Sequence, residues 1–133
     1  MPDLNLEKIV KSSEAVLHSE RYAYLQAREP AGSDHFMITH DSDEWTIITK
    51  EKNLPATSHD NSVKWFRMIE IRVSQPFIAK GFLAYVTKTL SHEGINVLVV
   101  STFSKDYIFV KEDAYQTAIR LLNQAGFPVK VKK

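Results

Sequence analysis

The chain has 133 residues, a formal net charge of +1 and no cysteine. A chain of this length forms one domain, or two very small ones that share a core. The absence of cysteine excludes disulfides, thiol nucleophiles, cysteine-ligated zinc and iron–sulfur clusters. The near-neutral charge provides no strong field toward nucleic acid or an anionic membrane, so we expect no membrane partner and consider nucleic acid unfavoured.

The N-terminal sequence carries no targeting pattern. Residues 1–8 contain no basic segment followed by an apolar run, so the sequence predicts no signal peptide. No apolar run approaches the roughly 20 residues that a membrane-spanning helix needs. We therefore expect a cytoplasmic protein.

The first half of the chain predicts one short helix and three strands. Apolar residues at helical spacing indicate a helix between residues 5 and 12, and residues 15–27 contain a strand. Residues 36–39 and 45–50 predict two further strands, joined by an acidic hairpin turn. The polar residues 54–63 indicate a linker.

Residues 64–132 predict the order strand, helix, strand, strand, helix, strand. We expect the strands at 64–73, 97–102, 107–111 and 129–132, and the helices at 77–93 and 113–125. This βαββαβ order is that of a ferredoxin-like unit, so we predict an α+β fold with both helices on one sheet face. The first half lacks a long amphipathic helix after its first strand. We interpret it as an incomplete copy that completes the sheet of the second half.

Several motifs resemble the ACT-domain family. The segment Gly81-Phe82-Leu83-Ala84 opens a helix, Gly94-Ile95 forms a turn, and Ser101-Thr102-Phe103-Ser104-Lys105-Asp106-Tyr107 leads into a strand. Residues 43–48 are similar to an acidic-x-Ser-aliphatic-aliphatic element of the same group. The resemblance covers roughly residues 15–127. It is to small stand-alone bacterial proteins with paired, aspartokinase-type ACT units, which are related to the cytosolic arginine sensors of animals.

The resemblance implies a non-catalytic regulatory protein that senses a ligand, typically an amino acid, where two ACT units meet. It implies an N-terminal ACT-like half at residues 1–60 and a C-terminal ACT domain at residues 61–133. We also expect a homodimer. The ligand-binding residues carried over are Thr46, Ile47, Gly81, Phe82, Ser101, Thr102, Phe103 and Asp106.

The chemistry of these residues suits an amino acid. Gly81 lets the backbone at a helix start approach a carboxylate closely. Asp106 suits an ammonium or guanidinium group, and Phe103 supplies an apolar or cation–π wall. Lys105 stands where the group has a small polar residue, and there it would neutralise Asp106 or oppose a cationic ligand.

Two other interpretations remain open. RNA-recognition motifs share the βαββαβ order, and residues 105–112 match their third strand at Lys, Tyr, Phe and Val. In that motif, however, glycine and an aromatic residue stand where this chain has Asp106 and Glu112. A purely structural homo-oligomer without ligand is the second alternative.

Catalytic and metal motifs are absent from the sequence. No histidine pair has the His-x-x-x-His spacing of a zinc site, and no Gly-x-Ser-x-Gly, phosphate-binding loop or dinucleotide fingerprint occurs. We therefore predict that the protein is not an enzyme and that it has no catalytic residues, no cofactor and no metal site.

Overall fold

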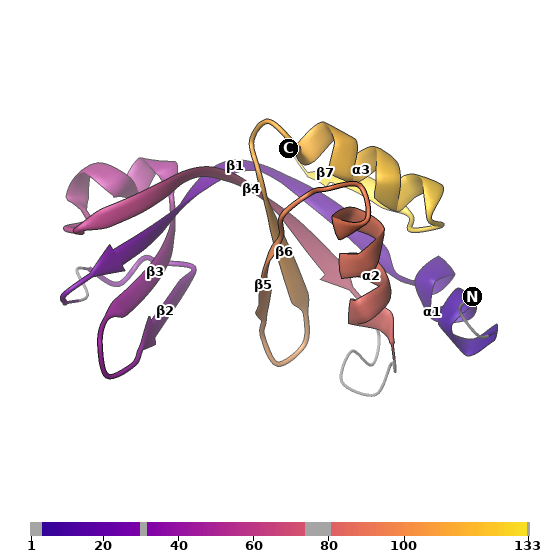
Figure 1. Cartoon of the computed structure of the whole chain (residues 1–133), viewed down its shortest axis with the longest axis horizontal. Coiled ribbons are helices and arrows are strands. Elements are labelled where there is room, and N and C mark those ends of the chain that lie inside the picture. The colour runs from indigo at the N-terminus through magenta and orange to yellow at the C-terminus, as the bar shows by residue number, and fades with distance from the viewer. Residues whose placement is uncertain (1–3, 30–31, 74–80, 133) are drawn as a thin grey trace. The chain divides into compact units, whose positions relative to one another are not determined.

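The computed structural model describes residues 4–29, 32–73 and 81–132. Its helices and strands follow one another in the order drawn in Figure 1. They are α1 (Leu4–Ser12), β1 (Glu14–Ala27), β2 (Met37–His40), β3 (Trp45–Lys50), a 3-10 helix η1 (Glu51–Ala56), β4 (Asn61–Arg72), α2 (Phe82–Ser91), β5 (Leu98–Ser101), β6 (Asp106–Lys111), α3 (Tyr115–Gln124) and β7 (Val129–Lys132).

The chain divides into two compact units. The larger unit comprises residues 1–19 and 67–133, and the smaller unit comprises residues 20–66. Strands β1 and β4 each run from one unit into the other, because the division falls within both of them. Each unit is described by itself below.

The larger unit contains the predicted βαββαβ elements together with the start of β1. Its strands are ordered β7, β1, β4, β6, β5. β5 and β6 are antiparallel neighbours with Ser101 opposite Asp106. β7 is parallel to the first part of β1, with Ala15 opposite Val129. The N-terminal strand therefore lies between the first and last strands of the βαββαβ set.

One face of this sheet is covered by α2 and α3, as predicted (Figure 1). Strand residues alternate between the two faces, so Ile69 and Ile71 of β4 point to the helices. The helices bury their apolar stripes against them, through Phe82 and Val86 of α2 and Leu122 of α3. This cluster is the core of the larger unit. Because strand residues alternate, the intervening side chains of β4 in this unit point to the opposite face of the sheet.

The smaller unit is built on a meander of strands. β3 is antiparallel to both β2 and the second part of β1. The predicted turn between β2 and β3 is closed by Asp41, whose Oδ1 accepts hydrogen bonds from the backbone N–H groups of Asp43 and Glu44. Those two bonds lower the pKa of Asp41. The small core of this unit is formed by Ala23, Leu25 and Ala27 of β1 together with Ile47 of β3.

Most predicted boundaries differ from the structure by one or two residues, and two segments differ more. The segment 54–63 is not a simple linker, because it contains the end of η1 and the start of β4 at Asn61. The described part of the predicted helix 77–93 begins at Phe82, and residues 77–80 lie outside the described residues. Gly81 precedes the helix with φ +75°, a left-handed conformation that glycine adopts without strain.

Candidate functional site

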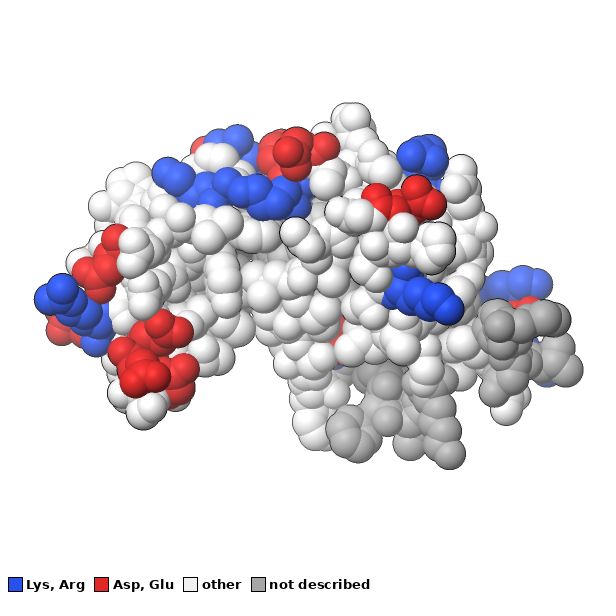
Figure 2. Space-filling model, viewed as in Figure 1, with Lys and Arg blue, Asp and Glu red and all other residues white. Residues whose placement is uncertain are grey.

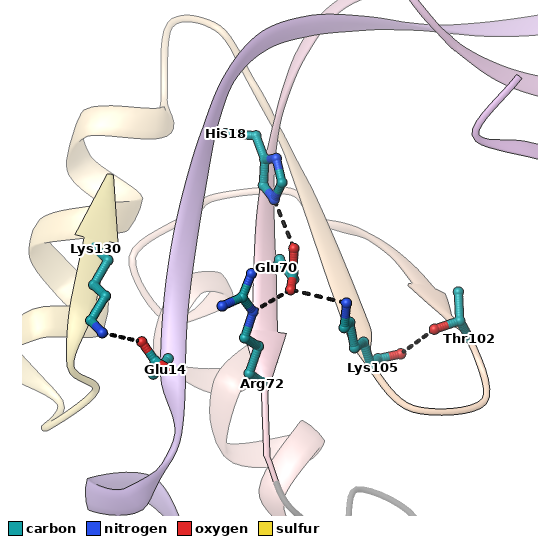
Figure 3. A network of polar contacts seen from close by, with 7 residues as sticks. All are labelled: Glu14, His18, Glu70, Arg72, Thr102, Lys105 and Lys130. Carbon is teal, nitrogen blue, oxygen red and sulfur yellow. Dashed lines mark hydrogen bonds and ion pairs between the residues drawn. The ribbon is translucent and has the colours of Figure 1, made fainter. Parts of the chain in front are cut away.

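A polar cluster lies on the face of the larger unit's sheet that points away from α2 and α3. It comprises His18 of β1, Glu70 and Arg72 of β4, and Lys105 before β6, and we call it the Glu70 network (Figure 3). Glu70 and Arg72 are two residues apart on one strand, so their side chains share a face. The network thus brings together side chains from three segments that are distant in the sequence.

Glu70 is the centre of this network. Its side chain is only 4% exposed, yet its two oxygens contact three basic groups. Oε1 lies 2.8 Å from His18 Nε2, and Oε2 lies 2.5 Å from Arg72 Nε and 3.4 Å from Lys105 Nζ. Both oxygens of this buried carboxylate have basic partners, so it orients the side chains around it.

The electrostatics of Glu70 follow from these contacts. Burial by itself raises the pKa of Glu70, because it penalises the charged form. The hydrogen bonds from Arg72 and His18, with the charges of Arg72 and Lys105, outweigh burial and lower the pKa to about 2. Glu70 is therefore ionised at neutral pH, and the N–H of His18 Nε2 must be the donor in their hydrogen bond. In return, Glu70 raises the pKa of Arg72.

A pocket of about 320 Å³ opens beside this network. Two of its lining residues, Arg72 and Lys105, belong to the network, and their side chains are 44% and 40% exposed. We call it the Arg72 pocket, and its lining residues are Ser12, Glu14, Arg72, Val73, Ser104 and Lys105. Glu14 contacts Lys130 of β7 at 2.6 Å, and this contact lowers the pKa of Glu14 (Figure 3).

The predicted site residues of the β5–β6 turn are partly brought together. The hydroxyl of Ser101 donates to Oδ1 of Asp106 at 2.5 Å, and Asp106 is only 8% exposed. The backbone N–H of Thr102 donates to the carbonyl of Lys105, which closes the turn. Phe103 projects fully into solvent. Three of the four residues therefore form one connected turn, and the aromatic ring lies outside it.

Lys105 does not contact Asp106, although the two residues are adjacent. Its ammonium group lies near Glu70, whereas the Asp106 carboxylate takes its hydrogen bond from Ser101. Neighbouring residues of an extended chain point to opposite faces, which explains the separation. The expected neutralisation of Asp106 by Lys105 is therefore replaced by an ion pair with Glu70.

The predicted residues at the start of α2 occupy two different environments. Phe82 is buried in the core, where its ring contacts Phe127 edge-on with centroids 5.8 Å apart. Gly81 borders an open groove of about 440 Å³ that also includes Tyr85 and Leu121. Within the described residues, no hydrogen bond or ring contact joins Gly81 or Phe82 to the β5–β6 turn.

Thr46 and Ile47 belong to the smaller unit. Thr46 lines a pocket of about 230 Å³ with Glu44, Gln26 and Asn61, and the Gln26 amide donates to Glu44 at 2.7 Å. The side chain of Ile47, in the middle of β3, is completely buried. The smaller unit therefore offers Thr46, but not the side chain of Ile47, to a ligand that approaches from solvent.

The sequence contained a signal for the Glu70 network that the prediction missed. The run from Ile69 to Arg72 alternates apolar and polar residues, which places Glu70 and Arg72 on one face of an expected strand. His18 and Lys105 carry no comparable signal, because their proximity to Glu70 depends on strand order.

Charged side chains of both signs are interspersed over the surface shown in Figure 2, in keeping with the net charge of +1.

Across residues 4–29, 32–73 and 81–132, no group of three His, Asp or Glu side chains is placed to hold a metal ion. In the same part of the chain, no helix combines the length and apolar character needed to cross a membrane.

Comparisons with known proteins address the fold. A crystal structure of a Vibrio cholerae protein of unknown function, described as a possible transport protein, has a TM-score of 0.75 at 19% identity and covers 91% of this chain and 95% of that one. An Agrobacterium tumefaciens protein has a TM-score of 0.72 at 23% identity, with 91% and 94% covered. The ligand-free regulatory subunit of aspartate kinase from Thermus thermophilus has a TM-score of 0.65 at 9% identity, with 87% and 98% covered.

These similarities define a mixed α+β protein of the ferredoxin-like class, which confirms the predicted fold class. No curated protein matches the chain in sequence. Residues 62–124 match the family model described as ACT domain. This match confirms the resemblance to the ACT-domain family seen in the sequence, and the aspartate kinase structures, at 9% and 12% identity, share the fold.

Proposed function

We propose that this protein is a non-catalytic regulatory protein that binds an amino acid where two ACT units meet. The match of residues 62–124 to the ACT domain supports a regulatory, ligand-binding role. Two structural neighbours are described as regulatory subunits or domains of aspartate kinase, which agrees with a regulatory module. The division into an ACT-like half at 1–60 and an ACT domain at 61–133 stays a prediction, as do the homodimer and the cytoplasmic location.

One observation in particular supports the proposed site. Asp106 is held in a buried position by the hydroxyl of Ser101 at the base of the β5–β6 turn. An oriented carboxylate of this kind suits the ammonium group that every amino acid carries. The other proposed contacts are Thr46, Gly81, Thr102 and Phe103, whereas the side chains of the predicted residues Ile47 and Phe82 are buried. Binding would favour the arrangement in which both units contact the ligand.

A thermal-shift screen against the twenty amino acids tests the proposal. A ligand at about 100 times its Kd stabilises the folded state by about 2.7 kcal/mol, which shifts the unfolding temperature of a domain this size by several degrees. The shift should disappear in Asp106→Asn and persist in Asp113→Asn, which alters an exposed aspartate. The screen should also include short RNA.

Each outcome of this screen has a separate meaning. A shift with one amino acid that Asp106→Asn abolishes would support the proposal. A shift with RNA alone would replace it with the RNA-binding alternative. A shift with neither would overturn the proposal and favour a structural homo-oligomer, whose mass is measured by light scattering.

A further inference from the structure

The Arg72 pocket carries an excess of positive charge. Glu14 is already paired with Lys130 at 2.6 Å. The single carboxylate of Glu70 is shared between Arg72 and Lys105, because both contact its Oε2. One positive charge on the wall of the pocket is therefore not balanced by these two carboxylates, even when His18 is counted as neutral.

Arg72 and Lys105 keep N–H donors beyond those that contact Glu70, although the charge of Glu14 also acts on Arg72. Arg72 uses only Nε on Glu70, and no other hydrogen bond or ion pair joins it to a described residue. Its terminal guanidinium nitrogens remain available, and an arginine fork suits two carboxylate oxygens at once. Lys105 contacts Glu70 at 3.4 Å and has three N–H donors. Both side chains are nearly half exposed, so a ligand from solvent can reach them.

The two cations are also held close together. Because both nitrogens contact the same oxygen atom of Glu70, they lie on one side of a single carboxylate. The buried position of Glu70 keeps that anchor in place without a conformational search on binding. The pocket, at about 320 Å³, lies within the size range of small-molecule sites, and Ser104 adds a hydroxyl to its wall.

We propose that the Arg72 pocket binds the carboxylate of a small organic acid, with Arg72 and Lys105 as its ligands and Glu70 as the residue that positions both. None of the eight residues predicted above for the amino-acid site lines this pocket. The inference therefore goes beyond the proposed function and does not depend on it. The favoured ligands are acids that carry a net negative charge, such as an acidic amino acid or a 2-oxo acid, rather than a cationic amino acid.

Isothermal titration calorimetry on the full chain tests this inference. The probes are succinate, aspartate, glutamate and 2-oxoglutarate, with asparagine, glutamine and inorganic phosphate as comparison ligands, at about 50 mM salt to limit screening. At least one acid should bind, and its amide counterpart should bind at least about tenfold more weakly, since a charged hydrogen bond is lost. Inorganic phosphate tests for unspecific attraction of an anion, because an arginine fork accommodates phosphate oxygens as well as carboxylate oxygens.

Matched variants locate the binding. Arg72→Gln and Lys105→Gln should each weaken binding of the acid by about tenfold or more. Arg120→Gln on α3 and Lys132→Gln on β7 remove the same charges at exposed positions outside the pocket and should leave affinity within about twofold. Circular dichroism establishes that each variant is folded.

Glu70→Gln distinguishes positioning from simple attraction. This change adds net positive charge, so attraction alone would tighten binding of an anion. If Glu70 positions Arg72 and Lys105, the affinity should fall instead. Tighter binding in Glu70→Gln would overturn the positioning role.

Three results would overturn the site itself. They are no acid binding to the unaltered protein at about 10 mM, equal losses in the control variants, or phosphate binding as tightly as every acid. Binding of an acid that requires Arg72 but not Asp106 supports this inference and leaves the proposed amino-acid site to its own test. Binding of an amino acid that requires Asp106 but not Arg72 supports the proposed amino-acid site instead of the Arg72 pocket.

Discussion

Replacement of Glu70 by glutamine should make the stability of the protein much less dependent on pH in the acid range. The pKa of Glu70 is lowered from 4.5 to about 2, mainly because the hydrogen bonds from Arg72 and His18 outweigh the effect of burial. Each pKa unit corresponds to about 1.4 kcal/mol, so the ionised carboxylate contributes about 3 kcal/mol to the free energy of unfolding. Its side chain is 4% exposed, so solvent screens this contribution little.

The sign of the pH dependence follows from the lowered pKa. Above pH 4.5, Glu70 is ionised in both the folded and the unfolded chain, and its stabilisation is fully present. As the pH falls toward 2, the unfolded chain takes up a proton first and the stabilisation is lost. The free energy difference between the unaltered protein and Glu70→Gln should thus fall from about 3 kcal/mol at pH 7 to about 1 kcal/mol at pH 3.

Urea unfolding followed by circular dichroism at both pH values measures this difference. Glu93→Gln is the control, because Glu93 is exposed and makes no ion pair with a described residue. Other carboxylates with lowered pKa values, such as Glu51 beside Arg21, act equally in all variants and cancel in the comparison. An equal cost of Glu70→Gln at pH 3 and pH 7 would refute the reasoning, because the cost would then come from packing.

Three further substitutions separate structural from ligand-facing roles, each measured by urea unfolding. Phe82→Ala should lower the free energy of unfolding by about 3–5 kcal/mol, since Phe82 is buried in the core, and a cost below 1 kcal/mol would contradict that. Phe103→Ala should change it by less than about 0.5 kcal/mol because the ring is fully exposed, so any effect on ligand affinity would be direct. Gly81→Ala should lower the free energy of unfolding by about 1–2 kcal/mol, because alanine disfavours the left-handed backbone of this position. An added Cβ meets no atom within 4 Å, so no clash contributes, and an unchanged free energy would argue against that conformation.

Local patterns in the sequence predicted most of the elements. The strand at 45–50 and the strand at 129–132 have the bounds that the structure gives to β3 and β7. Alternation along β4 and helical spacing along α2 are properties of neighbouring residues, so they are visible without a fold. The Ser-Thr-Phe-x-x-Asp-Tyr stretch likewise identified the ACT domain before any contact was known.

The sequence did not predict which strands distant in the chain pair with one another. β7 lies beside β1, which is more than a hundred residues away in the chain, rather than beside β4, the first strand of its own βαββαβ set. Either pairing would satisfy the hydrogen bonds of β7. Which strand pairs with β7 therefore depends on which strand edge lies beside it in the folded sheet.

The sequence by itself thus determined the elements, the α+β class and the ACT domain, because these follow from residue spacing within short segments. Only the tertiary structure decided that His18 and Lys105 join Arg72 around Glu70 and that Lys105 turns away from Asp106. The physical reason is that a buried carboxylate needs charged or hydrogen-bonding partners, and two of the three partners of Glu70 lie outside its own strand. Strand order, which no local pattern encodes, decides which basic side chains are within reach.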